Sequence, residues 1–514
     1  MSLFKAPWMS GLVSGLQNRV RRFESARSLK IGKILWCFVY FYFIPPQYIG
    51  ICIFLHPVMI HDLTKGRPAS VILLFAFPII LGNIFQQVYS LVDSIIVGRY
   101  VSYQALAGVG ITNGLTFFIF GFVLGITSGL GIKTAHFFGA KNFVKMRQSL
   151  GTGFIICIGL SILLTSLALL SIKPSLHFMG ATDEIYYYSQ SYLRITYVGL
   201  VSQVAYNVVA CILRALGDSK TPLLFLIFSS VLNIGLDILF VRYLAWGVQG
   251  AAWATVIAQL ISAICCFIYV FSRYKELRLH KEDFRTSWSF IWEHLRIGIP
   301  MALQFSITAF GVIVLYAALN AFPTTYIAGF TSASKIQSLG MLVPISLGVA
   351  IANYVGQNYG AGNLVRMRVG VNSALFMSSC VCIVVSVTMA LFATPLTSLF
   401  LDPDISGDVS EIYMASTQYL YISALFFPFL FLLFIYRNAL QGVGKTFMPL
   451  MAGVTELVIR VVASLILPNY FGYNGIILVD VLAWVGACLL LFVSYRFQMP
   501  RGRKFKFTTY PSIL

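Results

Sequence analysis

The stretch FGAKNFVKMR at residues 138–147 is one of the few polar segments in an apolar chain, and a close copy of it occurs later. Residues 359–368 read YGAGNLVRMR, which is identical at six of the ten positions and includes exchanges of Phe for Tyr and Lys for Arg. A basic loop that recurs in this way indicates that the chain contains two copies of a longer unit.

Other matches keep nearly the same offset between the two halves of the chain. They are SYLRI (191–195) with QYLYI (418–422), LRALGDSKTP (213–222) with LQGVGKTFMP (440–449), and AGVG (107–110) with AGFT (328–331). Four matches in register are hard to explain by chance recurrence of short loops, so they predict an internal repeat.

The composition is that of a membrane protein. The 514 residues are 58% hydrophobic and 10% charged, whereas about a quarter of the residues in soluble domains are charged. The net charge of +19 would suggest nucleic-acid binding on one compact basic surface. Here the basic residues lie in short runs between apolar stretches, so we expect a lipid bilayer and no nucleic acid as the partner.

From residue 68 onward, twelve apolar segments reach the roughly 20 residues that a spanning helix needs. They are 69–97, 104–135, 149–171, 186–210, 221–241, 250–271, 297–320, 326–356, 370–394, 412–436, 447–467 and 474–495. Six crossings return a chain to its starting side, so the two copies share one orientation. The fold class predicted is all-α integral membrane: two parallel six-helix bundles related by a pseudo-twofold axis near the membrane normal.

Loop charges predict the orientation. The loops that include the two copies of the opening stretch carry 20 Lys and Arg, and the alternate loops carry only Arg99, Lys173 and Arg242. The positive-inside rule therefore places the duplicated loops and the C-terminus in the cytoplasm, in a multi-pass protein of the bacterial plasma (inner) membrane.

We divide the chain into four parts. Residues 1–67 form an N-terminal extension, interfacial or re-entrant, or a stretch before the working start of translation. Residues 68–285 and 286–497 are the N-terminal and C-terminal six-helix bundles, and residues 498–514 are a basic cytoplasmic tail.

Ionisable groups inside spanning segments are the first functional candidates, because each costs roughly 2.5–3.5 kcal/mol on insertion. Asp93 lies in the first segment, and Asn233 and Asp237 lie four residues apart in the fifth. With Thr255 of the sixth segment, they are expected to meet in the outer half of the N-terminal bundle. Such a group could take up a proton or ligate a small cation, or it could be a polar network that holds helices together.

The second bundle has a different set of charges. Glu456 and Arg460 are spaced for an ion pair, which is either structural or part of a substrate site, and Asp480 shows no partner within its own segment. Arg194, where the second copy has Tyr421, is a candidate partner for one of the acids of the first bundle.

The sequence gives no support for nucleotide binding, a metal site or catalysis. QGVGKT resembles the end of a phosphate-binding loop, but Ala439 stands at the position that requires the first glycine. No metal-ligand spacing and no nucleophile–base arrangement is visible, so we expect neither an enzyme nor a cofactor. The energy for transport would then come from an ion gradient or from a partner protein.

The motifs together resemble the MATE (multidrug and toxic compound extrusion) transporters, of the bacterial NorM/DinF-like branch. The resemblance rests on PIILGNIFQQVYSLVDSIIVGRYV (78–101), ALAGVGI, FGAKN, LRALGDSKTP and VQGAAWATVIAQ, and it spans about residues 68–495. It implies two bundles around a V-shaped cleft, with drugs exported in exchange for H⁺ or Na⁺.

The resemblance also implies roles for individual residues. Asp93, Asn233, Asp237 and Thr255 match the coupling-ion residues of the family, and its polar cleft residues carry over onto Gln86 and Asn207. Gln304, Glu456 and Arg460 are further candidates for the substrate cleft that do not come from the resemblance. The seventh and tenth segments here, PMALQFSITAFG and ISALFFPFLFLL, lack the acids that NorM-type members carry there. This departure shifts the expected coupling site to the N-terminal bundle.

The function predicted is secondary active export of amphipathic, cationic small molecules by a protein expected to be a monomer. The alternative is a flippase for lipid-linked oligosaccharides of the same superfamily, which would place several basic residues in the cleft for a pyrophosphate. The basic candidates for that role are Lys133, Arg194, Lys335 and Arg460. A membrane-embedded enzyme is disfavoured because no His/Asp, Ser/Lys or metal constellation is visible, and a receptor is disfavoured because it does not explain the parallel halves.

Overall fold

The computed structural model describes residues 62–179, 182–274, 277–399 and 409–500. The predicted N-terminal extension lies outside the described residues except for its last six, and the basic tail lies outside them except for its first three. Within the described ranges the regular structure is helical.

The first half of the chain begins with α4, whose 33 residues include Asp93. Its elements are α4 (Pro68–Tyr100), α5 (Tyr103–Gly139), α6 (Phe143–Phe178), α7 (Asp183–Val198), α8 (Leu200–Ala215), α9 (Lys220–Asp237), the π-helical turn η1 (Ile238–Tyr243) and α10 (Gly247–Arg273).

The second half repeats this order of spans after a short 3₁₀ turn, η3 (Lys281–Phe284). Its helices are α11 (Trp288–Leu319), α12 (Thr324–Gly360), α13 (Leu364–Leu391), the short α14 (Ala393–Ser398), α15 (Val409–Gly442), α16 (Phe447–Phe471) and α17 (Tyr473–Gln498). In the described part of the chain, 11 helices are long and apolar enough to cross a membrane, and the bent pair α7–α8 makes up to 12. The predicted all-helical membrane fold is confirmed.

Many helices extend beyond the predicted segments. The predicted span 149–171 lies inside α6, which has 36 residues and is therefore about 54 Å long at 1.5 Å per residue. A bilayer core is only about 30 Å thick. Hydropathy marks the part of a helix that lies in hydrocarbon, and the polar ends continue past it.

The fourth span differs from the prediction of one continuous helix over 186–210. It is broken between α7 and α8, which meet at an angle of 47°. Gly199 lies at the break, and a Cβ there would lie 2.1 Å from the Val256 Cγ2 of α10. A side chain at Gly199 would push α10 away from the bend between α7 and α8, so this close approach requires glycine.

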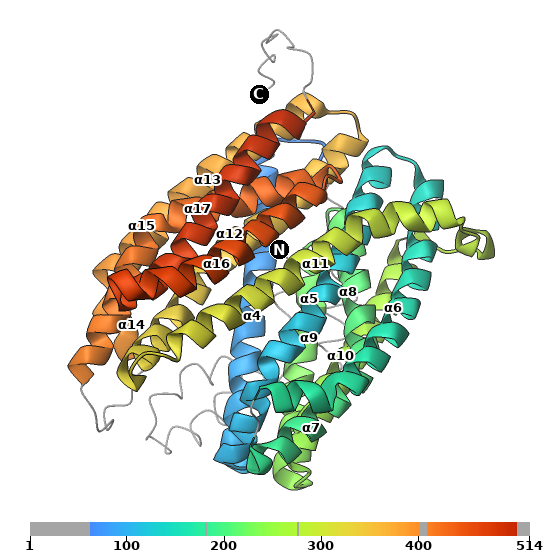
Figure 1. Ribbon diagram of the computed structural model, residues 1–514. Coiled ribbons are helices and arrows are strands. Elements are labelled where there is room, and N and C mark those ends of the chain that lie inside the picture. Colours follow the sequence, from blue (N-terminus) through green and yellow to red (C-terminus); the bar gives the residue numbers. More distant parts are fainter. Residues whose placement is uncertain (1–61, 180–181, 275–276, 400–408, 501–514) are drawn as a thin grey trace, which may run out of the picture. The chain divides into compact units, whose positions relative to one another are not determined.

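The helices gather in two groups that follow the halves of the sequence. Figure 1 shows α13, α15, α16 and α17 together in one group, and α6, α8, α9 and α10 in the other. Between the halves, α5 packs along α11 and α12, and α4 packs against α12. Thus α4 and α5 make most of the contacts with the second half, and α6 and α8 add smaller ones to α11 and α12.

The two copies of the duplicated loop lie at a place where the backbones of the two halves pack closely together. A Cβ on Gly139 would lie 2.0 Å from the Gln357 carbonyl oxygen, and a Cβ on Gly360 would lie 2.0 Å from the His136 carbonyl oxygen. His136 Nε2 also lies 2.7 Å from the Gly442 carbonyl oxygen. These contacts join the two halves at the end of the molecule that carries the duplicated loops. We call this contact the seam, and equivalent glycines lie on both sides of it.

Candidate functional site

Polar side chains from three helices of the first half meet in one buried cluster. Asp93 comes from α4, Asn233 and Asp237 from α9, and Thr255 from α10. Asp93 and Asp237 are within hydrogen-bonding reach of each other, and the Asn233 amide donates to Thr255 Oγ1 over 3.2 Å. Asp237 and Asn233 are buried, with 0% and 2% of their surfaces exposed. The structure therefore brings these four predicted residues together.

The oxygens of this cluster lack donors. One Asp93 carboxylate oxygen, both Asp237 oxygens and the Asn233 amide oxygen are buried, and none accepts a hydrogen bond from the described residues. A buried acceptor without a donor is costly, and buried carboxylates are more costly still. Neither of the two facing carboxylates can donate a hydrogen bond to the other unless one of them is protonated. The cluster is thus suited to bind a proton or a small cation.

Two tyrosines adjoin these acids, and the sequence reading did not single them out. Tyr89 interacts electrostatically with both aspartates and lies within hydrogen-bonding reach of Thr255. Tyr192 of α7 also interacts with both aspartates. Tyr89 could have been found from its position four residues before Asp93 on the same helix face. Tyr192 had no such signal, because only the packing of α7 brings it to the site.

The backbone changes at the cluster. α9 ends at Asp237 and continues as the π-helical turn η1. π-helical turns inside helices occur frequently at functional sites. On the other side of the cluster, α4 reaches the second half through Asn83, which donates to Ser346 Oγ of α12 over 2.9 Å. Asp93 therefore lies on a helix that contacts both halves.

The second half buries its charges as a closed network. Glu456 accepts from Arg437 and lies 3.7 Å from Arg460 Nη1, and Arg460 Nε donates to Asp480 Oδ1 over 2.8 Å. The network has two acids and two bases from α15, α16 and α17. Asp480, which has no partner in its own helix, thus finds one in α16, and Arg437 is a member that sequence reasoning missed.

The other candidates are placed separately. Gln86 is exposed on α4, and the Asn207 amide donates to Gln203 within α8 over 2.9 Å. Gln304 is buried in α11 and accepts from Gln441 of α15 over 2.8 Å. Arg194 is exposed on α7, and neither aspartate of the cluster has it among its interactions. It is therefore not the partner of these acids that we expected.

Residues 78–239 and 300–466, one stretch in each half, match the MatE family. The chain belongs to this family. Among its relatives, the probable multidrug resistance protein YpnP of Bacillus subtilis (strain 168) is 26% identical over 450 residues, which are 86% of this chain and 98% of YpnP. The probable multidrug resistance protein NorM of Thermotoga maritima is 26% identical over 80% of this chain and 87% of that protein.

Solved structures agree with the fold of this MATE transporter. One, described as the outward-facing conformation of a multidrug resistance MATE family transporter of the MOP superfamily, superposes with a TM-score of 0.79 at 24% identity, covering 86% of this chain and 98% of the other. The predicted family is confirmed, and the protein is a multi-pass membrane transporter rather than an enzyme.

Proposed function

We propose that this MATE transporter exports amphipathic, cationic small molecules in exchange for H⁺ or Na⁺, and that Asp93 and Asp237 bind the coupling ion. The names of the relatives YpnP and NorM, both multidrug resistance proteins, support the substrate class. We also propose that the duplicated loops and the C-terminus face the cytoplasm of a bacterial cell, on the basis of the loop charges.

The observation that carries the proposal is the group of four buried oxygens without donors. Asp93, Asn233 and Asp237 contribute only acceptors toward one another, while the Asn233 amide is directed to Thr255. A proton would turn one carboxyl into a donor, and a sodium ion would be ligated by carboxylate and amide oxygens. Either ion satisfies the same oxygens, so the cluster supports ion coupling without choosing between them.

Coupling to the rest of the molecule would run through α4. This helix carries Asp93, packs against α9 in its own half and contacts α12 in the other half. Binding an ion between Asp93 and Asp237 removes the repulsion between α4 and α9, so it favours the arrangement in which these helices are close. The driving force is about 2.3 kcal/mol per charge per 100 mV, plus the concentration gradient of the ion.

The flippase alternative needs unpaired basic side chains in the cleft. Two of the candidates are neutralised: Lys133 pairs with Glu293 over 2.7 Å, and Arg460 lies in the closed network with Glu456 and Asp480. A pyrophosphate would have to break these pairs, which counts against the flippase.

The test uses purified protein in sealed vesicles without Na⁺. A pH gradient is imposed, and movement of a cationic dye is followed for the wild type, Asp93→Asn and Asp237→Asn. We expect gradient-driven movement in the wild type and none in either variant. Movement that begins only after Na⁺ is added would identify Na⁺ as the coupling ion.

Glu293→Gln is the matched control, since it removes an acid whose side chain is 49% exposed and that lies outside the cluster. It should transport like the wild type. Normal transport by both aspartate variants would rule out the proposed coupling site, and absence of dye movement under both gradients would shift the function to the flippase.

A further inference from the structure

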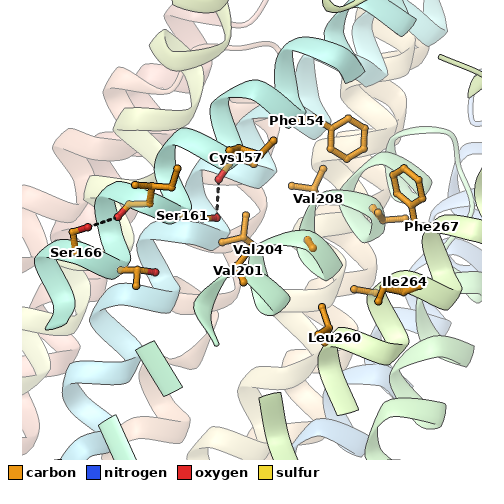
Figure 2. A pocket seen from close by; sticks show the side chains of 16 residues that line it. Phe154, Cys157, Ser161, Ser166, Val201, Val204, Val208, Leu260, Ile264 and Phe267 are labelled. Carbon is orange, nitrogen blue, oxygen red and sulfur yellow. Dashed lines mark hydrogen bonds between the residues drawn. The ribbon is translucent and has the colours of Figure 1, made fainter. Parts of the chain in front are cut away.

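The first half has an apolar groove that is separate from the acidic cluster. It has a volume of about 550 Å³ and lies between α6, α8 and α10. Figure 2 shows the side chains that line it, among them Phe154, Val204, Val208, Leu260 and Phe267. All the residues of its wall lie well inside helices that are long and apolar enough to span the membrane or in the bent pair α7–α8.

The hydroxyl groups in the wall of the groove are already used. Ser161 donates to the Cys157 carbonyl oxygen over 2.7 Å and Ser166 donates to that of Ile162 over 2.8 Å, both shown in Figure 2. Thr165 donates to the Tyr197 carbonyl oxygen over 3.2 Å. The groove therefore offers hydrocarbon surface and suits an apolar chain rather than a polar molecule.

The bend at Gly199 accompanies the groove. α8 leaves the line of α7 by 47°, and Gly199 packs on Val256 of α10. The wall is open toward the bilayer, because several of its large side chains are exposed, such as Ile158 at 61% and Ile162 at 65%. The groove therefore opens toward the acyl chains of the lipid bilayer.

Two basic residues lie beyond one end of the groove. Lys173 follows Ile162 and Ser166 at helical spacing on α6, and Arg194 precedes the wall residue Val201 by two turns. The Thr165–Tyr197 hydrogen bond sets the register of α6 and α7. At 1.5 Å per residue, Arg194 then lies about 5 Å and Lys173 about 12 Å past the level of Thr165.

Both basic side chains are exposed, and neither takes part in an ion pair within the described part of the chain. An exposed charge near the edge of the hydrocarbon is costly unless it reaches a head group or a counter-ion. The nearest acids along α7, Asp183 and Glu184, lie at the start of that helix, so Glu184 is about 15 Å along the axis from Arg194.

We propose that this surface binds one anionic phospholipid. An acyl chain fills the groove between α6, α8 and α10, and the lipid phosphate lies between Arg194 and Lys173, where charge-assisted hydrogen bonds to the phosphate satisfy both cations. Under the orientation proposed above, the lipid belongs to the outer leaflet. The binding site itself does not depend on the transport activity.

The experiment is a titration of the delipidated protein in detergent, followed by native mass spectrometry. Phosphatidylglycerol is compared with phosphatidylcholine of the same acyl chains. We expect one phosphatidylglycerol to bind in preference to phosphatidylcholine. The double variant Arg194→Gln/Lys173→Gln should weaken binding of phosphatidylglycerol roughly tenfold, as expected for lost charge-assisted hydrogen bonds.

Further variants separate the contribution of the acyl chain from that of the head group. Ala205→Phe places a ring in the groove, whose wall includes Ala205, and should weaken binding of both lipids while the charges remain. Lys141→Gln is the matched control, because it removes one exposed charge just before the start of α6, at the end away from Lys173. It should bind phosphatidylglycerol like the wild type.

The proposal is overturned if the double variant, folded as shown by an unchanged thermal midpoint, binds phosphatidylglycerol as tightly as the wild type. It is equally overturned if Lys141→Gln weakens binding as much as the double variant does, because the effect would then be a nonspecific loss of charge. Soluble glycerol phosphate binding as tightly as the lipid would assign the site to a free phosphate and exclude a role for the groove.

Discussion

The two halves share a topology but treat their buried charges in opposite ways. In the second half, Glu456 and Asp480 are matched by Arg437 and Arg460 in a closed network. In the first half, Asp93 and Asp237 face each other with no basic side chain among their interactions. The same order of helices therefore carries a neutral charge cluster in one half and an acidic one in the other.

The difference shows which buried charges are available for an ion. A pair of carboxylates with basic partners is already satisfied, and adding a proton or sodium ion there would break existing contacts. Carboxylates with no donor are satisfied only by something that enters. The same residue type therefore has a structural role in one half and is the proposed ligand site in the other.

The largest effect on stability is expected from opening the closed network. Glu456→Gln leaves Arg437 and Arg460 with one acid between them, so the unfolding free energy should fall by about 3–5 kcal/mol. The measurement is unfolding in mixed micelles. Glu293→Gln, the same change in a more exposed pair with Lys133, should cost no more than about 1 kcal/mol. Equal losses in the two variants would contradict the structural role of the network.

Substitutions at the seam test a feature that the two halves share, the close packing of equivalent glycines. Gly139→Ala and Gly360→Ala each place a methyl 2.0 Å from a backbone oxygen of the other half, so each should destabilise the protein by about 1–3 kcal/mol. Gly159→Ala is the control, with nothing within 4 Å of the new methyl and a gain in helix propensity of about 1 kcal/mol. Harmless substitutions at both seam glycines would mean that the halves are not packed there.

A smaller effect should distinguish the two copies of the loop. Lys141 has a φ of 55° where its counterpart Gly362 has 72°, a left-handed region that favours glycine. Lys141→Gly should therefore stabilise the protein by up to about 1 kcal/mol, and Gly362→Ala should destabilise it by about the same amount. Thermal midpoints of the two variants measure this, and shifts of the same sign would contradict the explanation.

The smallest change in stability is expected in the acidic cluster. Asp93→Asn and Asp237→Asn remove charges that have no partner, so the unfolding free energy at neutral pH should stay within about 1 kcal/mol of the wild type or rise. The transport assay should nevertheless show loss of activity. A fall of several kcal/mol in either variant would assign the cluster to helix packing, the alternative that the sequence left open.

Much of the fold could be predicted from the sequence, because a bilayer requires every spanning segment to be long and apolar. A spanning helix must hide its backbone polar groups over about 30 Å of hydrocarbon, so the apolar segments appear at full length in the sequence. The duplicated loop revealed the repeat, and the spacing of Asn233 and Asp237 placed them on one face of a helix. The bend at Gly199 was missed, because a single glycine in a spanning helix does not by itself predict a break.

Contacts between helices were decided only by the tertiary structure. Nothing local brings Tyr192 to Asp93, joins Arg437 to Glu456 or separates Arg194 from the acids, since each depends on how helices distant in sequence rotate against one another. The sequence by itself predicted the apolar spans, the repeat and the acids that are costly to place in a membrane. The tertiary structure decided which of those acids found a base and which were left with only each other.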